Sequence, residues 1–132
     1  MTAEGAVHRV SAIDDALSIY FAAWNEPDPD ERRRLLARSV TDDAELVDPT
    51  GRSQGVDGLA ERIGRYQSAA PGTKVVPASG VDAHNDVVRY AWKIVDSQGR
   101  DVMEGLDVVK RVDDGRLQRI LMFHGSLPPP DH

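Results

Sequence analysis

The order of two hydrophobic periodicities constrains the fold of this chain more than any other feature. Apolar residues in roughly the first half recur at helical spacing, whereas from residue 74 onward they alternate as they do in strands. The strand-like segments are residues 74–81, 87–96, 101–112 and 116–124, with short turn sequences between them. Helices followed by a run of hairpin-connected strands predict an α+β domain.

Three helices are expected in the first half of the chain. Residues 11–24 and 28–39 each carry apolar residues at helical spacing, and an Asp-Pro pair opens the second segment. A brief strand over residues 44–48 ends in a Pro-Thr-Gly turn, after which Asp57 is typical of the N-cap of a third helix. We therefore expect three N-terminal helices packed on a curved, mainly antiparallel sheet.

The length of 132 residues fits a single domain. We assign this domain to residues 11–125, between an N-terminal extension over residues 1–10 and a flexible, proline-rich tail over residues 126–132. The chain has no cysteine, which excludes disulfides, thiolate zinc sites and a cysteine nucleophile. This composition favours a cytoplasmic location.

Charge and histidine spacing argue against several classes of partner. A formal net charge of −6 disfavours nucleic acid, and we interpret the one dense basic run, residues 32–34, as the solvated face of a helix. No apolar stretch has the length of a membrane span, so no membrane partner is expected. The four histidines are not clustered at ligand spacing, and we expect neither a metal site nor a cofactor.

Asp107 is the most unusual polar residue in the strand-like half. It lies between Leu106 and Val108 in a long apolar segment, where an ionised carboxylate without partners would cost several kcal/mol. Either it faces water, or it is protonated or paired in a cavity.

The last strand is apolar on both faces. Ile120, Met122 and His124 form one row, and the other row contains Leu121 and Phe123. A sheet with two apolar faces must be covered on both sides. We expect helices on one face and a second copy of the chain, in a homodimer, on the other.

Helices laid across a strongly bent sheet leave a cavity, and several side chains are expected to point into it. They are Tyr20 and Trp24 on the first helix, Asp48 at the end of the short strand, and Asp107 and His124 on the long strands. Polar groups that converge in an apolar pocket indicate a small-molecule site.

Several motifs together resemble one known superfamily. They are residues 20–25 with the acidic-proline turn after them, residues 42–49, Gly55 at the opening of the third helix, and residues 105–107 and 114–117. Over residues 11–125 the layout is similar to the nuclear-transport-factor-2-like superfamily of cone-shaped α+β domains. That superfamily includes SnoaL-like polyketide cyclases, ketosteroid isomerases, limonene epoxide hydrolases and non-catalytic binders. The resemblance implies a cone-shaped domain with a ligand pocket.

Ketosteroid isomerase gives the nearest likeness at reacting positions. Its general-base aspartate precedes a proline, as Asp48 does here, and its oxyanion hole joins a first-helix tyrosine, matched by Tyr20, to a protonated strand aspartate, matched by Asp107. The resemblance implies a cofactor-independent isomerase or cyclase that acts on an enolisable, apolar carbonyl compound. The carboxylate would take the proton and two neutral donors would hold the enolate oxygen.

This chain also departs from the isomerases. Ile63 stands where they carry an aromatic residue that supports the oxyanion tyrosine, with Tyr66 about one turn further on. His124 replaces a pocket aromatic and adds a group that titrates near neutral pH. The side chains that we expect to contact a ligand are Trp24, Ile63, Arg89, Trp92, Met122 and His124.

Two alternatives stay open. One is a non-catalytic ligand-binding or dimerisation domain of the same fold. The other is an epoxide hydrolase-like enzyme, in which Arg89, Asp48 and Asp107 would surround a water molecule. The arginine-aspartate motif of those enzymes is not reproduced in this sequence, and this alternative predicts that Arg89 faces the cavity.

Overall fold

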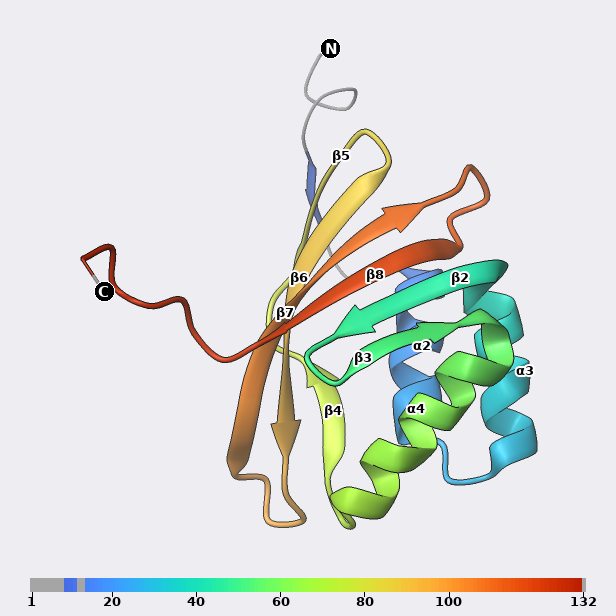
Figure 1. Ribbon diagram of the computed structural model, residues 1–132. Helices are drawn as coiled ribbons and strands as arrows, with labels where there is room; N and C mark the ends of the chain where they lie inside the picture. The colour runs from blue at the N-terminus through green and yellow to red at the C-terminus, as the bar shows by residue number, and fades with distance from the viewer. Residues whose placement is uncertain (1–8, 12–13, 132) are drawn as a thin grey trace.

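The computed structural model describes residues 9–11 and 14–131 (Figure 1). A short strand over Arg9–Ser11, which the sequence does not predict, precedes the first helix, and the three helices and the later strands follow in the expected order. The helices are α2 (Asp15–Asn25), α3 (Pro29–Ser39) and α4 (Gly55–Ala69), and none of these three is long and apolar enough to cross a membrane. The strands are β1 (Arg9–Ser11), β2 (Val40–Asp48), β3 (Gly51–Gln54), β4 (Lys74–Pro77), β5 (Val81–His84), β6 (Val87–Val95), β7 (Asp101–Arg111) and β8 (Leu117–His124). Residues 12–13 of the expected first helix and residues 1–8 of the expected extension lie outside the described part.

The strands of the described chain join one sheet in the order β1-β5-β6-β7-β8-β2-β3, with β4 as a further partner of β6. The β2–β8 pair is parallel and the other pairs are antiparallel. Figure 1 shows α2, α3 and α4 together on one side of the sheet. The prediction of an α+β domain with helices beside a mainly antiparallel sheet is therefore confirmed.

The single strand predicted over residues 74–81 is not continuous, because β4 ends at Pro77 and a second strand, β5, begins at Val81 and runs on to His84. Both strands pair with β6, and at the break between them the Ser79 hydroxyl accepts a hydrogen bond from the backbone N–H of Ala91 at 2.8 Å. Val75 and Val81 are both buried, but Pro77 and Ser79, which lie between them on the same side of the alternation, are exposed. The burial pattern is therefore interrupted where the two strands separate.

β2 and β3 form a hairpin that the sequence shows only as a turn. Asp48 pairs with Gly51, whose positive φ of 138° is accessible to glycine, and β3 leads directly into α4. The helix begins at Gly55 with Gln54 as its N-cap, three positions before the expected N-cap Asp57. The hairpin thus fixes where the first turns of α4 lie relative to the end of β2.

Arg32 corrects the interpretation of residues 32–34 as a solvated face. Its side chain is buried, and its guanidinium donates hydrogen bonds to the carbonyl oxygen of Glu26 at 3.1 and 2.9 Å and to Gln67 Oε1 at 2.9 Å. Because Gln67 belongs to α4, this arginine joins α3 to α4. The two arginines that follow it are exposed.

Side-chain alternation along β6 decides which residues face the helices. Val88, Tyr90 and Trp92 are buried, whereas Arg89 between them is exposed. The same alternation along β7 buries Gly105 and Asp107. The inner faces of these two neighbouring strands form the sheet wall of the site described below.

Candidate functional site

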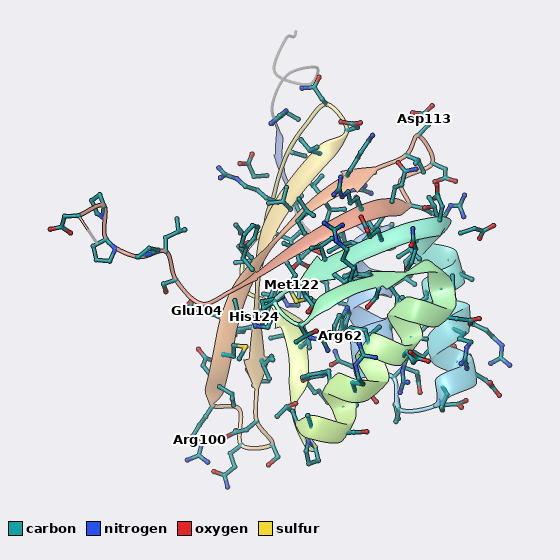
Figure 2. All side chains as sticks on the ribbon, in the orientation of Figure 1. Arg62, Arg100, Glu104, Asp113, Met122 and His124 are labelled. Atoms are coloured by element: carbon teal, nitrogen blue, oxygen red, sulfur yellow. The ribbon has the colours of Figure 1, made fainter. Side chains whose placement is uncertain are left out.

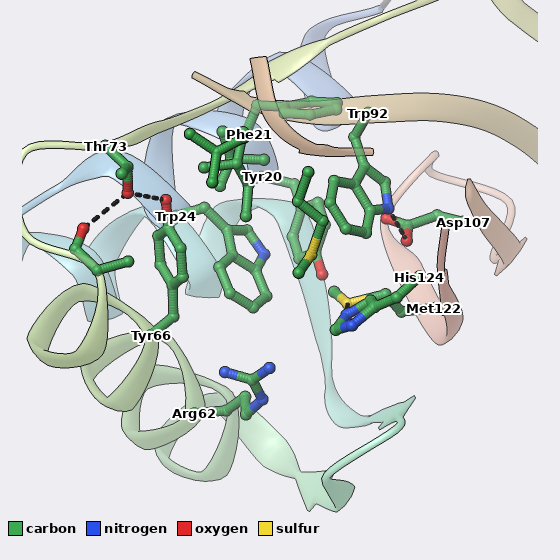
Figure 3. A pocket seen from close by; sticks show the side chains of 15 residues that line it. Tyr20, Phe21, Trp24, Arg62, Tyr66, Thr73, Trp92, Asp107, Met122 and His124 are labelled. Carbon is green, nitrogen blue, oxygen red and sulfur yellow. Dashed lines mark hydrogen bonds between the residues drawn. The ribbon is translucent and has the colours of Figure 1, made fainter. Parts of the chain in front are cut away.

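A cavity of about 220 Å³ lies between the helices and the inner face of the sheet, with walls from α2, α4, β4, β6, β7 and β8 (Figure 3). Its lining is mostly apolar. The polar or charged side chains among the lining residues are Tyr20, Arg62, Tyr66, Thr73, Asp107 and His124. An apolar cavity with a few convergent polar groups is typical of a small-molecule site, and this volume suits a small ligand.

Asp107 lies on the sheet wall with neutral hydrogen-bond donors at both carboxyl oxygens. The Tyr90 hydroxyl donates to Oδ2 at 2.8 Å, and the Trp92 indole Nε1 donates to Oδ1 at 2.9 Å. The residue is 3% exposed, and this burial raises its pKa from 3.8 to about 7, although the two hydrogen bonds act in the opposite direction. Asp107 can therefore hold or release a proton near neutral pH.

Gly105 makes the contact between Trp92 and Asp107 sterically possible. A Cβ atom at this position would overlap the Trp92 ring and the backbone of Phe123. The missing side chain lets the indole lie against β7, with its nitrogen directed at Asp107.

Tyr20 presents a polar group to the cavity from α2. Its hydroxyl is buried and makes no hydrogen bond of ordinary geometry with the described residues. Burial raises the pKa of this hydroxyl above its usual value, and Asp107 adds to the rise, while Trp24 and Arg62 act against it. Tyr20 therefore stays protonated and can donate to an acceptor in the cavity.

Asp48 and Arg62 form a buried ion pair beside the cavity. Arg62 Nε donates to Asp48 Oδ2 at 2.8 Å, and the other carboxylate oxygen accepts from the backbone N–H and the hydroxyl of Thr50 at 2.7 and 2.6 Å. Burial raises the pKa of Asp48, but the hydrogen bonds from Thr50 and Arg62 outweigh it and hold the pKa below 3.8. Asp48 is therefore ionised at neutral pH.

His124 lies at the C-terminal end of β8, on the rim of the cavity. Its ring packs edge-on against Trp92 with centroids 5.5 Å apart, and its Nε2 lies 3.4 Å from Met122 Sδ. Figure 2 locates Arg62 on α4 and Met122 and His124 on β8, and Figure 3 shows the three side chains around the same cavity. Burial and the Arg62 charge lower the pKa of His124, with Asp48 opposing, so the imidazole is neutral at pH 7.

The structure brings six of the predicted site residues to one cavity. They are Tyr20, Trp24, Trp92, Asp107, Met122 and His124. Asp48 does not line the cavity, and it approaches the site only through Arg62. Ile63 is fully buried in the core beneath α4 and does not line it either.

The structure also corrects the predicted position of Arg89. The prediction that it faces the cavity is wrong, because its neighbours Val88 and Tyr90 occupy the inner face of β6. Its side chain is 65% exposed and donates to Asp82 Oδ2 at 2.8 Å. The three groups proposed for epoxide hydrolysis are therefore not assembled in this structure.

Arg62 and Tyr90 were not predicted from the sequence. Arg62 lies three residues after Leu59 and four before Tyr66, both on the inward side of α4, so its place in the helical period was visible. Tyr90 pairs directly with Asp107 across β6 and β7, a register that the sequence does not specify. Among the described residues, no group of three or more histidine, aspartate or glutamate side chains is arranged to hold a metal ion.

No family model matches the chain, and no curated protein matches it. Several solved structures do. A protein from Agrobacterium tumefaciens, described as a presumed isomerase of the SnoaL-like family, is 32% identical with a TM-score of 0.78, and the match covers 84% of this chain and 95% of that chain.

Two further matches have lower identity and show the fold alone. A presumed polyketide cyclase from Sinorhizobium meliloti is 22% identical, with a TM-score of 0.64 and coverage of 83% and 94% of the two chains. An NTF2-like protein of unknown function from Exiguobacterium is 18% identical, with a TM-score of 0.64 and coverage of 86% and 100%. The fold is therefore NTF2-like. Because the chain is 32% identical to the Agrobacterium protein over nearly all of that protein, it belongs to the SnoaL-like family.

Proposed function

We propose that this protein is a cofactor-independent enzyme of the isomerase or cyclase type, acting on a small, apolar, enolisable carbonyl compound inside a cone-shaped domain. The solved structures named as an isomerase and a polyketide cyclase support the general class. The observation that carries the proposal is a buried carboxyl group with a pKa of about 7, Asp107, in the same apolar cavity as an unpartnered tyrosine hydroxyl, Tyr20.

Asp107 is the proton-transferring group in this proposal. A general base works best when its pKa is near the working pH, and Asp107 meets this condition while it faces the cavity. Its ionised form removes the proton from the carbon next to the substrate carbonyl, and the C–H electron pair becomes the enolate π bond. The neutral Asp107 that results holds the proton for the next step.

Tyr20 stabilises the charge that develops on the carbonyl oxygen. Its buried hydroxyl has no hydrogen-bond partner to give up among the described residues, so it is available when the enolate forms. In an isomerisation, Asp107 returns the proton to a different carbon of the enolate. In a cyclisation, the enolate carbon attacks a second carbonyl of the same molecule, and the proton goes to the new alkoxide.

Asp48 has a different part in this proposal from the one that the family likeness implies. Its oxygens are engaged by Thr50 and Arg62, and its pKa is lowered, which makes it a weak base. We assign it as the counter-ion that positions Arg62. The arrangement with Asp48 as the base, and with Tyr20 and neutral Asp107 as the donors, predicts the opposite pattern of variant activities.

The test is hydrogen–deuterium exchange at the methyl group of acetophenone, together with conversion of 3-cyclohexenone to its conjugated isomer. We expect Asp107→Asn to lower both rates by about two to four orders of magnitude, and Tyr20→Phe by about two to three. Asp48→Asn is expected to lower them by less than about tenfold. Asp114→Asn, an exposed turn residue, is the matched control.

Each outcome of this test assigns the site. Full activity in a folded Asp107→Asn protein, with loss in Asp48→Asn, returns the role of base to Asp48. A wild-type protein that binds acetophenone and accelerates neither reaction is a non-catalytic binder. Both results contradict the mechanism proposed above.

We also propose that the outer face of the sheet binds a second copy of the chain. Leu106 of β7 and Phe123 of β8 pair in register on this face and are 36% and 57% exposed. Adjacent exposed apolar side chains favour burial in an interface. We expect a dimer in sedimentation at micromolar concentration, shifted toward monomer by Phe123→Glu. A monomeric wild-type protein contradicts this proposal.

A further inference from the structure

Arg62 places a positive charge on the helix wall of the cavity, and most of its hydrogen-bonding capacity is unused. The residue is 9% exposed, and its Nε donates to Asp48 at 2.8 Å. Within the described residues, neither terminal nitrogen of its guanidinium makes a hydrogen bond, although the residue lines the cavity. Figure 3 shows the guanidinium below Trp24, and its central carbon lies 5.6 Å from the centre of that ring.

Asp48 holds this guanidinium in a fixed orientation. One carboxylate oxygen is anchored by Thr50 and the other receives the Nε hydrogen bond. The aromatic ring of Trp24 limits movement on another side. The two terminal nitrogens are therefore pre-organised, and a planar pair of N–H donors matches the two oxygens of a carboxylate.

We propose that the cavity takes ligands that carry a carboxylate, bound by Nη1 and Nη2 of Arg62. The apolar body of the ligand lies between Trp24 and Trp92, and the reactive carbonyl lies at Tyr20 and Asp107. The position of the carbonyl rests on the function proposed above, whereas the carboxylate site does not. The substrate class is thus an apolar keto acid rather than a neutral ketone.

The local charges limit the ligand to a single negative charge. Asp48 occupies the Nε edge of Arg62, and Asp107 on the opposite wall is partly ionised near pH 7. A dianionic phosphate would bring a second charge into an apolar cavity that offers only one guanidinium among the described lining residues. A monocarboxylate uses both free nitrogens and brings one charge.

The experiment compares two probes of nearly equal shape, 4-oxo-4-phenylbutanoate and its neutral amide, 4-oxo-4-phenylbutanamide. Binding is followed by calorimetry and by the fluorescence of Trp24 and Trp92, which are the only tryptophans in the chain and both line the cavity. Because hydrogen bonds to a charged group are the stronger ones, we expect the carboxylate to bind about ten- to hundredfold more tightly. Equal affinity, tighter binding of the amide, or no binding of either at millimolar concentration overturns the proposal.

Variants of Arg62 assign the preference to its guanidinium. Arg62→Gln keeps a donor for Asp48 but removes the charge and the paired nitrogens, and we expect the two probes to bind within about twofold of each other. Arg65→Gln removes an exposed arginine one turn further along α4 and is expected to keep the wild-type preference. A preference that survives in Arg62→Gln, or that disappears in Arg65→Gln as well, contradicts the assignment.

Arg62→Lys covers the case in which the glutamine variant does not fold. It keeps a positive charge opposite Asp48 but lacks the planar pair of donors, so the preference should fall several-fold while the far-ultraviolet circular dichroism is unchanged. An unchanged preference in this folded variant overturns the bidentate site.

Failure of this inference and failure of the proposed enzyme give different results. Asp107→Asn should lose exchange activity and keep the carboxylate preference, because the two groups lie on opposite walls. If the wild-type protein catalyses exchange but binds both probes equally, only the carboxylate site is refuted. If it prefers the carboxylate through Arg62 but catalyses no exchange next to the carbonyl of either acetophenone or 4-oxo-4-phenylbutanoate, only the enzymatic proposal is refuted.

Discussion

Asp48 and Asp107 are both nearly inaccessible to solvent and electrostatically opposite. Their exposed fractions are 7% and 3%, yet the pKa of Asp48 lies below 3.8 and that of Asp107 rises to about 7. Asp48 has a cationic partner in Arg62, whereas Asp107 receives its hydrogen bonds from the neutral donors Tyr90 and Trp92. The stronger desolvation of Asp107, together with the hydrogen bonds from Thr50 and the charge of Arg62 at Asp48, therefore decides which carboxyl group stays ionised.

In the proposed function, the regions around Asp48 and Asp107, called here the Asp48 corner and the Asp107 corner, have different parts. The Asp48 corner, at the junction of β2, β3 and α4, stabilises a fixed charge and turns it toward the cavity. The Asp107 corner, on β6 and β7, keeps a carboxyl group close to its titration point. Permanent charge suits recognition, and an intermediate pKa suits proton transfer.

The largest expected effect is a pH-dependent stability that belongs to Asp107. Its folded-state pKa of about 7 exceeds the usual 3.8, so the native state binds the proton more tightly. The stabilisation is fully present below about pH 4 and is lost as pH rises to about 7, a change on the order of 4 kcal/mol. Urea unfolding at several pH values should show this decline in wild type and not in Asp107→Asn.

The contribution of Asp48 to the free energy of unfolding should depend on pH in the opposite direction, and in a lower pH range. Because its folded-state pKa is lowered, its contribution is present above about pH 3.8 and is lost as pH falls below that value. The stability difference between wild type and Asp48→Asn should therefore shrink in acid. If the stability contributions of Asp48 and Asp107, each measured as wild type minus its asparagine variant, were lost in the same pH window, the contrast between the two carboxyl groups would be refuted.

The second effect comes from breaking the ion pair. Arg62→Met leaves Asp48 buried without its cation, and we expect a loss of about 3 kcal/mol in the free energy of unfolding at pH 7. The double variant with Asp48→Asn should recover much of this loss, because no buried charge is then left unpaired. Additive losses in this double-mutant cycle would show that the pair is not coupled.

The smallest expected effect is the loss of the Tyr90 hydrogen bond in the Asp107 corner. Tyr90→Phe removes the donor to Asp107 Oδ2, which should cost about 1 kcal/mol of stability and raise the pKa of Asp107 further. The pH–rate profile for acetophenone exchange should move to higher pH. Tyr66→Phe, whose hydroxyl contacts Thr73 at 2.6 Å instead, is the comparison for a lost cavity-wall hydroxyl. Equal shifts in the two variants would contradict the specific role of Tyr90.

Local pattern was sufficient for the parts of the site that lie on regular elements. The helical spacing of Tyr20 and Trp24, and the strand alternation of Asp107 and Met122, predicted which side of each element faces inward. The same rule, applied consistently, excludes Arg89, since Trp92 is an odd number of residues away and faces the cavity. The prediction for Arg89 was wrong because it rested on the likeness to epoxide hydrolases and disregarded the alternation of side chains along the strand.

The ion pair could not be predicted because it depends on a contact made through tertiary structure. Asp48 and Arg62 are 14 residues apart, and the β2–β3 hairpin brings them together by placing the start of α4 beside the end of β2. β3 contains no β-branched residue, so its sequence gives little sign of a strand. The direction of the pKa shift of Asp48 could not be predicted either, because it depends on this contact with Arg62.

Gly105 has a consequence for how this family member can vary. Trp92 forms part of the cavity wall and also donates to Asp107, and it can do both only because position 105 has no side chain. Any larger residue there must displace the indole, which would change the space for a ligand and the acidity of the carboxyl in one step. The space in the cavity and the pKa of Asp107 are therefore linked through a single hydrogen atom on β7.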